Sequence, residues 1–171
     1  MPRATQANIE KYYDKLVLAM EHFEIDTPRR IAAFLAQIGH ESASLRYVKE
    51  IASGSAYEGR KDLGNIHPGD GVRFKGRGLI QITGRSNYKQ VSDALDYDFI
   101  KNPTHLEWPG PACFSAAWFW HSRGLNKYAD KDDFLTISKR INGVNKKTGK
   151  PNGWADRLAR WKVCKMALAI E

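Results

Sequence analysis

Apolar residues recur at three- or four-residue intervals near the start of the chain, between charged and polar positions. The stripe consists of Ile9, Tyr12, Tyr13, Leu16, Val17, Met20 and Phe23. This spacing is typical of an amphipathic helix with one face on a core. It predicts a helix from about Asn8 to Glu24.

A second helix is expected directly afterwards. Thr27 supplies an N-cap oxygen, and Pro28 stands at the first helical position, where its missing N–H costs nothing. The apolar stripe of this helix consists of Ile31, Phe34, Leu35 and Ile38. Glu41 lies three residues beyond Ile38, so its carboxylate projects from the margin of the buried face.

The middle of the chain carries turn residues instead of a helical pattern. Residues 54–78 hold seven of the fourteen glycines, together with Asn65, Pro68 and Asp70, which predicts a long irregular segment. Loops of this length are uncommon and usually functional. Residues 79–83 are too short for a helix and contain β-branched side chains, so they predict a short strand or an extended piece.

Helical patterns return in the second half of the chain. They predict helices over residues 87–95, 111–122, 134–141 and 155–170, the last two separated by a polar loop. The 111–122 segment is apolar nearly all round, as in a helix buried at the centre of a small α domain. The chain is therefore predicted to be mainly α, with long loops and at most a short β element.

Length and composition predict one compact domain spanning residues 1–171. With 42% apolar residues the chain can bury a core, and no run reaches the roughly 18 apolar residues of a membrane span. The N-terminus lacks the apolar stretch of a signal peptide, so we expect a cytoplasmic protein without membrane insertion unless another factor exports it. Cys113 and Cys164 lie in apolar stretches and are expected to be buried free thiols.

The net charge indicates which class of partner the chain binds. The sequence has 27 Lys and Arg against 19 Asp and Glu, which gives a net charge of +8. This charge favours an anionic partner, which is a nucleic acid, a membrane surface or an acidic polymer. The basic residues are spread along the chain. They indicate a positive surface or cleft rather than a disordered arm that binds nucleic acid.

Several catalytic motifs are excluded. His40-Glu41 begins like a zinc-protease helix, but Ser44 stands where the second histidine is needed. Residues 71–78 lack the lysine and hydroxyl of a phosphate-binding loop and the third glycine of a dinucleotide fingerprint. No G-x-S-x-G elbow is present, and Cys113 lies where a thiolate is poorly stabilised.

Two carboxylates offer a different chemistry. Glu41 and Glu50 are nine positions apart, which on a continuous helix means about 180° of rotation and about 13 Å of rise. If the helix ends or turns near residues 42–45, as the small and polar residues there permit, both carboxylates can line one cleft. Glycoside hydrolysis needs such a pair: one carboxyl donates a proton and the other activates water. Spacing alone equally fits a helix-edge Glu41 paired to an arginine, and it favours Glu50 as an exposed loop glutamate.

Six segments, spanning residues 32–161, match a known family in order. They are Gly39-His40-Glu41-Ser42, the Glu50 segment, Tyr57-Glu58-Gly59-Arg60, the run GRGLIQITGRSNY from Gly76 to Tyr88, Ile141-Asn142-Gly143 and Asp156-Arg157. The chain thereby resembles glycoside hydrolase family 19, which holds plant-type chitinases and many bacteriophage endolysins. The resemblance implies a lysozyme-like, chitinase-like helical domain with a cleft lined by loops. The size of one bare domain is similar to the endolysins.

The resemblance also implies a role for each matched residue. Glu41 is implied to be the general acid and Glu50 the general base, with Thr83 helping Glu50 to hold the attacking water. The implied sugar-binding residues are Gln81, Asn87, Tyr88 and Asn142. Arg157 completes this group as the arginine that sets the charge environment of the acid. From the residues alone, Gln81, Thr83 and Asn87 fit ordinary strand-end and helix-cap polarity better.

Two departures from the plant pattern leave alternatives open. The interval between the two glutamates is shorter, so Glu58 is kept as a second candidate for the base. After Asn142-Gly143 the plant pattern has an acidic residue where this chain has Val144-Asn145-Lys146-Lys147. The partner of Arg157 is therefore open.

Charge decides the expected substrate. The resemblance implies an inverting mechanism without metal or cofactor, in which the carboxyl groups stand about 6.5–9.5 Å apart. Peptidoglycan carries peptide carboxylates beside a β-1,4 amino-sugar backbone, and a +8 protein is attracted to it but not to neutral chitin. We therefore expect a monomeric endolysin of the muramidase or glucosaminidase type, with no nucleic-acid partner. It would cleave peptidoglycan glycan strands after a separate factor releases it from the host bacterial cytoplasm.

Three alternatives remain for the function. The first is a chitinase acting on chitin oligomers. The second is a non-catalytic basic module that binds cell wall or nucleic acid, although such a module has no use for a desolvated acid. The third is a lytic transglycosylase, which cleaves the same bond with a single glutamate and without water.

Overall fold

The computed structural model describes residues 1 and 3–170, and nearly half of these residues lie in helices of nine or more residues. These are α1 (Gln6–His22), α2 (Pro28–Glu41), α4 (Arg85–Leu95), α5 (Pro109–Ser122), α7 (Phe134–Asn142) and α8 (Trp154–Ala167). The shorter elements are η1 (Ser55–Tyr57), η2 (Lys61–Leu63), α3 (Asp70–Arg73), η3 (Pro103–Glu107) and α6 (Asn126–Ala129). The apolar pattern predicts the long helices to within a few residues. It misses the short ones, because three to five residues show no helical repeat.

Capping residues decide where the first two helices begin. Thr5 accepts a hydrogen bond from the Asn8 N–H at 3.2 Å, so α1 starts at Gln6, two residues before the predicted start. Thr27 accepts from the Arg30 N–H at 3.3 Å. Pro28 occupies the first position of α2, as the sequence predicts.

Helix α5 is the centre of the core, as its apolar composition predicts. Its fully buried side chains include Ala112, Cys113, Ala116, Ala117 and Trp120. Trp120 meets Phe34 of α2 edge to face, with 5.5 Å between the ring centroids. Helix α1 packs against α5, and α2 packs against α8. No helix in the described part of the chain is long and apolar enough to cross a bilayer.

The two cysteines are free and buried, as predicted. Burial raises the pKa of the Cys113 thiol to about 12 and also raises the pKa of Cys164. A thiol with so high a pKa stays protonated near neutral pH and is a poor nucleophile. Burial of Cys113 therefore disfavours its use as a catalytic nucleophile, in agreement with the sequence.

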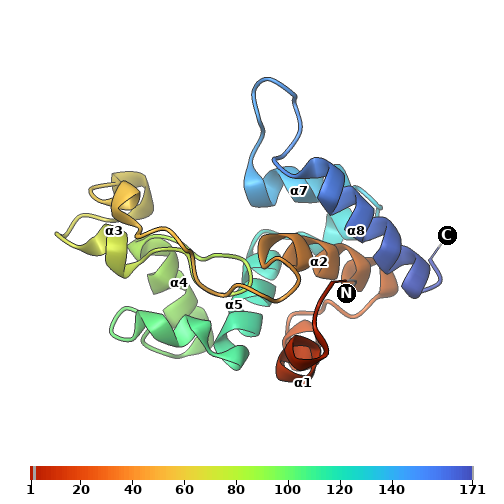
Figure 1. Ribbon diagram of the computed structural model, residues 1–171, viewed down its shortest axis with the longest axis horizontal. Helices are drawn as coiled ribbons and strands as arrows, with labels where there is room; N and C mark the ends of the chain where they lie inside the picture. The colour runs from red at the N-terminus through yellow and green to blue at the C-terminus, as the bar shows by residue number, and fades with distance from the viewer. Residues whose placement is uncertain (2, 171) are drawn as a thin grey trace.

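Two regions lie on either side of α5 (Figure 1). Helices α1, α2, α7 and α8 form one of them, which we call the helical region. Residues 46–108, with α3, α4 and the surrounding loops, form the other, which we call the loop region. The loop of residues 143–153 between α7 and α8 stands away from the helices (Figure 1).

The predicted strand at residues 79–83 is instead part of a tight turn. Arg77 and Ile82 exchange two backbone hydrogen bonds, at 3.1 and 2.8 Å, and residues 78–81 connect them. Gly78 and Gln81 have φ angles of +79° and +59°, which reverses the chain within four residues. β structure in the described residues is limited to isolated bridges, from Lys49 to Arg77 and from Arg77 to Ile82.

Candidate active site

Glu41 is the last residue of α2 and is held by an arginine of α8. Arg157 Nη2 donates to Glu41 Oε1 at 2.5 Å. The other Arg157 nitrogens donate to Gln37 Oε1 at 2.5 Å and to the Asn152 carbonyl at 3.0 Å. The Arg157 side chain is 1% exposed and that of Glu41 17%. Among the described residues, Arg157 thus pairs with one carboxylate. An amide and a backbone carbonyl take its other bonds.

The preceding residue on each helix makes a second contact between α2 and α8. His40 Nδ1 lies 2.7 Å from Asp156 Oδ2, and Arg160 Nε donates to the same oxygen at 2.6 Å. Burial disfavours the charged carboxylate, but the hydrogen bonds from Arg160 and His40 hold the pKa of Asp156 below its usual value. The matched dipeptides His40-Glu41 and Asp156-Arg157 therefore meet side by side and fix α2 against α8.

The chain turns sharply after Glu41, where the small and polar residues permit a turn. Ser42 Oγ donates to a carbonyl of the last turn of α2 at 2.5 Å and accepts from the Leu45 N–H at 2.9 Å. Residues 43–45 all have left-handed backbone conformations, with φ angles of 49°, 63° and 66°. Three non-glycine residues in this conformation are costly, and such strain clusters at functional sites. The turn directs residues 46–50 into the loop region.

Glu50 follows this turn and is held by backbone and side-chain groups of the loop region. Its N–H donates to the Gly76 carbonyl at 2.8 Å, and the Gly76 N–H donates to Glu50 Oε2 at 3.0 Å. The Tyr57 hydroxyl donates to Glu50 Oε1 at 2.9 Å. Burial and this hydrogen bond raise the pKa of Tyr57, so the phenol remains a donor. Both oxygens of Glu50 are therefore oriented.

Two further predicted residues meet Glu50 beside Gly76. A Cβ atom added at Gly76 would lie 3.2 Å from Glu50 Oε2 and 3.3 Å from Thr83 Oγ1. The same Cβ atom would lie 2.7 Å from Gln81 Oε1. The three polar side chains thus border one small space that a side chain at Gly76 would occupy. The structure brings Glu50, Thr83 and Gln81 together.

The same side chains also satisfy nearby carbonyl groups. Thr83 Oγ1 donates to the Gln81 carbonyl at 2.9 Å, and Gln81 Nε2 donates to the Gly78 carbonyl at 3.0 Å. Asn87 Nδ2 donates to the Thr83 carbonyl at 2.7 Å. These contacts are the ordinary strand-end and helix-cap hydrogen bonds that the residue types alone lead us to expect. They leave the Thr83 hydroxyl oxygen and Gln81 Oε1 able to accept hydrogen bonds from water or a ligand.

Tyr88 is too deeply buried to contact a sugar directly, so its predicted role in sugar binding is wrong. It is fully buried, and its hydroxyl donates to the Lys75 carbonyl at 2.6 Å and accepts from Arg77 Nη1 at 2.9 Å. Burial raises the pKa of Tyr88 to about 12, although the adjacent Arg77 acts in the opposite direction. Tyr88 therefore holds the backbone of residues 75–77 from inside the core, next to Gly76.

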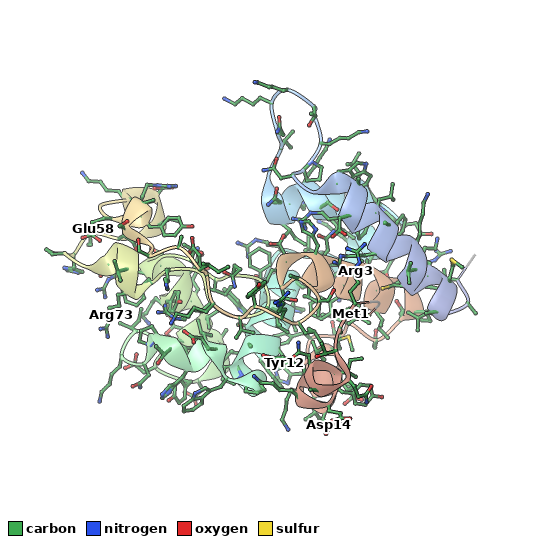
Figure 2. All side chains as sticks on the ribbon, viewed as in Figure 1. Met1, Arg3, Tyr12, Asp14, Glu58 and Arg73 are labelled. Carbon is green, nitrogen blue, oxygen red and sulfur yellow. The ribbon has the colours of Figure 1, made fainter. Side chains whose placement is uncertain are left out.

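Glu58, the second candidate for the base, is engaged elsewhere. Its two oxygens accept the N–H groups of Gly69 and Gly71, at 2.7 and 2.8 Å. Figure 2 shows Glu58 beside α3, at the outer end of the loop region. Glu50 rather than Glu58 shares a space with Thr83.

Asn142 lies at the end of α7 and joins the two ends of the following loop. The Asn152 N–H donates to Asn142 Oδ1 at 3.0 Å. Asn142 is exposed, and no hydrogen bond among the described residues uses its amide nitrogen. Asn152 also supplies the carbonyl that Arg157 binds, which connects this loop to the residue that holds Glu41.

Sequence reasoning assigns no role to two polar residues of this site, Gln37 and Tyr57. Gln37 is fully buried, accepts from Arg157 and donates to Ser138 Oγ at 2.7 Å. It lies one helical turn before Glu41 and therefore on the same face of α2. An amide side chain at this position could have been recognised in the sequence as part of the site. Tyr57 falls within a matched segment, but its contact with Glu50 depends on loop geometry that no periodicity encodes.

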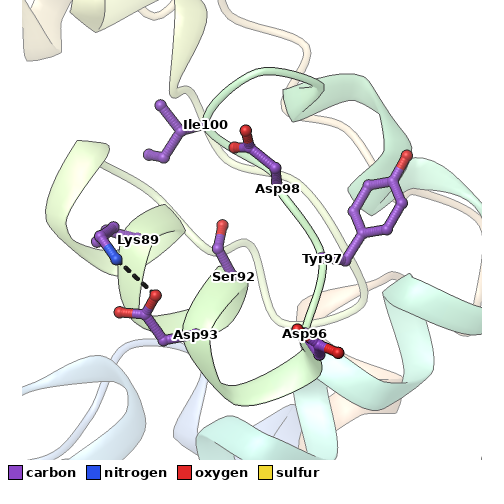
Figure 3. A pocket seen from close by; sticks show the side chains of 7 residues that line it. All are labelled: Lys89, Ser92, Asp93, Asp96, Tyr97, Asp98 and Ile100. Carbon is purple, nitrogen blue, oxygen red and sulfur yellow. Dashed lines mark hydrogen bonds and ion pairs between the residues drawn. The ribbon is translucent and has the colours of Figure 1, made fainter.

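A separate hollow of about 420 Å³ lies along α4 and the loop that follows it (Figure 3). Its lining consists of Lys89, Ser92, Asp93, Asp96, Tyr97, Asp98 and Ile100. Lys89 is already paired with Asp93 at 2.5 Å. The hollow shares no residue with the site around Glu41 and Glu50, and it is not part of that site.

Comparison with known families identifies the chain. The family model for glycoside hydrolase family 19, described as class I chitinase, matches residues 24–140. The chain belongs to glycoside hydrolase family 19. The family match confirms the resemblance carried by the sequence motifs.

Curated family 19 relatives include plant enzymes. The acidic endochitinase SP2 of Beta vulgaris is 30% identical over 141 residues, which cover 80% of this chain and 48% of that protein. An endochitinase of Arabidopsis thaliana is 35% identical over 131 residues, which cover 76% of this chain and 45% of that protein. The chain spans about half the length of these curated relatives.

Solved family 19 structures share the fold. Chitinase C of Streptomyces griseus has a TM-score of 0.79 at 23% identity, over 98% of this chain and 77% of that one. The class IV chitinase of Zea mays has a TM-score of 0.75 at 22% identity, over 98% of this chain and 82% of that one. The predicted chitinase-like helical fold is thereby confirmed.

Proposed function

We propose that this chain hydrolyses β-1,4 glycosidic bonds in a polymer of N-acetylated amino sugars by an inverting acid/base mechanism. The observation that carries the proposal is the arrangement around Glu50, where the Thr83 hydroxyl and the Gln81 amide share one space with its carboxylate. A second carboxylate, Glu41, ends the helix on the other side of the connecting turn. A family 19 chain with two separately held carboxylates fits this reaction.

In this mechanism Glu41 donates a proton to the leaving glycosidic oxygen as the bond from C1 to that oxygen breaks. Arg157 binds Glu41 Oε1, and no described residue hydrogen-bonds Oε2, which is the oxygen that can carry the proton to substrate. A water molecule held by Thr83 and Glu50 attacks C1 from the opposite face. Glu50 takes the proton that this water loses.

Two substrate polymers are candidates. The plant relatives are named endochitinases, which favours chitin oligomers. The net charge of +8 favours peptidoglycan, because its stem peptides carry carboxylates that attract a cationic enzyme. In the second case the chain acts as a monomeric endolysin that reaches the wall from the host bacterial cytoplasm through a separate release factor.

The deciding experiment offers the purified chain chitin hexamer and purified peptidoglycan in parallel. Mass spectrometry identifies the fragments, and proton NMR follows the anomer that forms first. Inverted reducing ends from either polymer support the proposed mechanism. Anhydro ends would instead indicate a lytic transglycosylase, and binding without any cleavage would indicate a non-catalytic module.

A further inference from the structure

The loop between α7 and α8 carries positive charge and no negative charge. Residues 143–153 read GVNKKTGKPNG, with Lys146, Lys147 and Lys150 and no aspartate or glutamate. The lysines that form ion pairs among the described residues are Lys89 and Lys165, so these three keep their charge unpaired. Residues 143–150 are exposed, and Figure 1 shows the loop standing away from the body of the molecule.

The loop has a defined shape, because its backbone is hydrogen-bonded within itself. The Asn145 N–H donates to the Lys150 carbonyl at 2.9 Å, and the Gly149 N–H donates to the Asn145 carbonyl at 2.9 Å. Asn145 Oδ1 also accepts from the Lys147 N–H at 3.0 Å. Pro151 is buried where the loop returns to α8. The three lysines are therefore presented on a turn rather than on a disordered tail.

The returning end of the loop meets the residues that hold the proposed acid. The Asn152 carbonyl accepts from Arg157 Nε at 3.0 Å, and Arg157 binds Glu41. Gly153 packs so closely on His40, the neighbour of Glu41, that no Cβ atom fits between them. The loop that carries the lysines is thus anchored, through Asn152 and Gly153, at the end of α2 that holds Glu41.

We propose that this lysine loop, residues 143–153, binds carboxylates that project from the glycan strand cleaved at Glu41. The partner is peptidoglycan, whose stem peptides carry carboxylates beside the sugar backbone, whereas chitin offers the lysines no charge. This inference rests on the proposed glycosidase function and names its substrate. Single exposed lysine–carboxylate contacts are weak and salt-sensitive, so the three lysines act together.

The test compares the unmodified chain with the triple variant Lys146→Gln, Lys147→Gln and Lys150→Gln. A matched control removes the same charge elsewhere through Lys11→Gln, Lys101→Gln and Lys131→Gln, which are exposed positions outside the loop. Each protein is assayed on peptidoglycan, on peptidoglycan with its carboxylates amidated, and on chitin hexamer. Co-sedimentation with intact peptidoglycan measures binding independently of cleavage, and thermal melts confirm folding.

At low ionic strength we expect the loop variant to lose about fivefold to tenfold in kcat/KM and in binding on native peptidoglycan. The loss should be absent on amidated peptidoglycan and on chitin, and it should shrink near 0.15 M salt, where the Debye length is about 8 Å. An equal loss in the control variant would assign the effect to net charge and overturn the proposal. So would unchanged binding, or an equal loss on chitin. If the unmodified chain cleaves neither polymer, the proposed function fails, while co-sedimentation still decides the role of the loop.

Discussion

Glu41 and Glu50 are held by two different kinds of structure. Glu41 ends a helix, and its ion pair with Arg157 joins two helices whose apolar faces form the helical region. Glu50 lies in the loop region, where backbone groups of Gly76 and the Tyr57 hydroxyl orient it. One carboxylate is thus placed by helix packing and the other by hydrogen bonds between irregular segments.

Because of this difference, substitutions at the two carboxylates should affect the packing of the protein to different extents. The helical region is supported by α5 and its fully buried side chains, so a change at Glu41 leaves most of the packing intact. Residues around Glu50 depend on single hydrogen bonds and on the absence of a side chain at Gly76. A single substitution in the loop region should therefore change the positions of the site side chains, because few other contacts hold them in place.

The largest effect is expected from Glu41→Gln. The amide oxygen still accepts from Arg157, so the fold should be kept, but the buried guanidinium loses its one carboxylate partner and the melting temperature should fall. The glutamine side chain can no longer donate the catalytic proton. General acid catalysis typically contributes about 10²–10⁴-fold, and turnover should fall by that factor. Near-normal cleavage of the polymer by a folded variant would contradict the assignment of the acid.

Glu50→Gln should reduce turnover almost as much, because the attacking water loses its base. Glu58→Gln is the matched control in the same region, since Glu58 binds backbone N–H groups beside α3 and lies apart from Thr83. It should lower the melting temperature slightly and leave specific activity of the folded protein unchanged. An inactive Glu58→Gln beside an active Glu50→Gln would reverse the two roles.

The same division explains how much the sequence predicts. Helical periodicity predicts α2, α5 and α8, whereas the small and polar residues after Glu41 only permit the end of α2 that the structure shows. Periodicity cannot predict the contact between Tyr57 and Glu50, because the chain between them is irregular and turns at Gly54, whose φ angle is +88°. Nor can a motif show which of its members is buried. Asn87 and Tyr88 are neighbours in one matched block, yet Tyr88 lies entirely in the core.

Thr83→Val tests whether the space beside Glu50 holds a water molecule. Valine keeps the branched shape and removes the hydroxyl, so we expect about a tenfold lower kcat with little change in polymer binding. Thr83→Ser should restore most of the activity because it returns the hydroxyl. If Thr83→Val lowers only the melting temperature, its bond to the Gln81 carbonyl is the function of the hydroxyl.

The smallest expected effect is a difference in acid stability between the two regions. Arg85 donates to both oxygens of Asp70 at 2.8 and 2.6 Å, joining the start of α4 to α3. These hydrogen bonds hold the pKa of Asp70 below its usual value of 3.8, although burial acts in the opposite direction. Outside the loop region, Asp130 and Asp156 form comparable pairs with Arg30 and with His40 and Arg160. Their side chains are 41% and 36% exposed, against 2% for Asp70, so solvent screens them more.

A carboxyl group with a depressed folded-state pKa stabilises the protein fully above its unfolded pKa, and this contribution is lost as the pH falls through the folded value. Below about pH 4, the loop region should therefore open before the helical region. Asp70→Asn should cost about 2 kcal/mol near pH 7, and its stability should converge with that of the unmodified chain as the pH falls through the depressed folded-state pKa of Asp70. Hydrogen exchange at amides of α4 and α2, corrected for intrinsic rates, measures both effects. Loss of protection in the two helices together, or a constant difference between the proteins across this pH range, would show that the Asp70–Arg85 pair does not set the acid stability of the loop region.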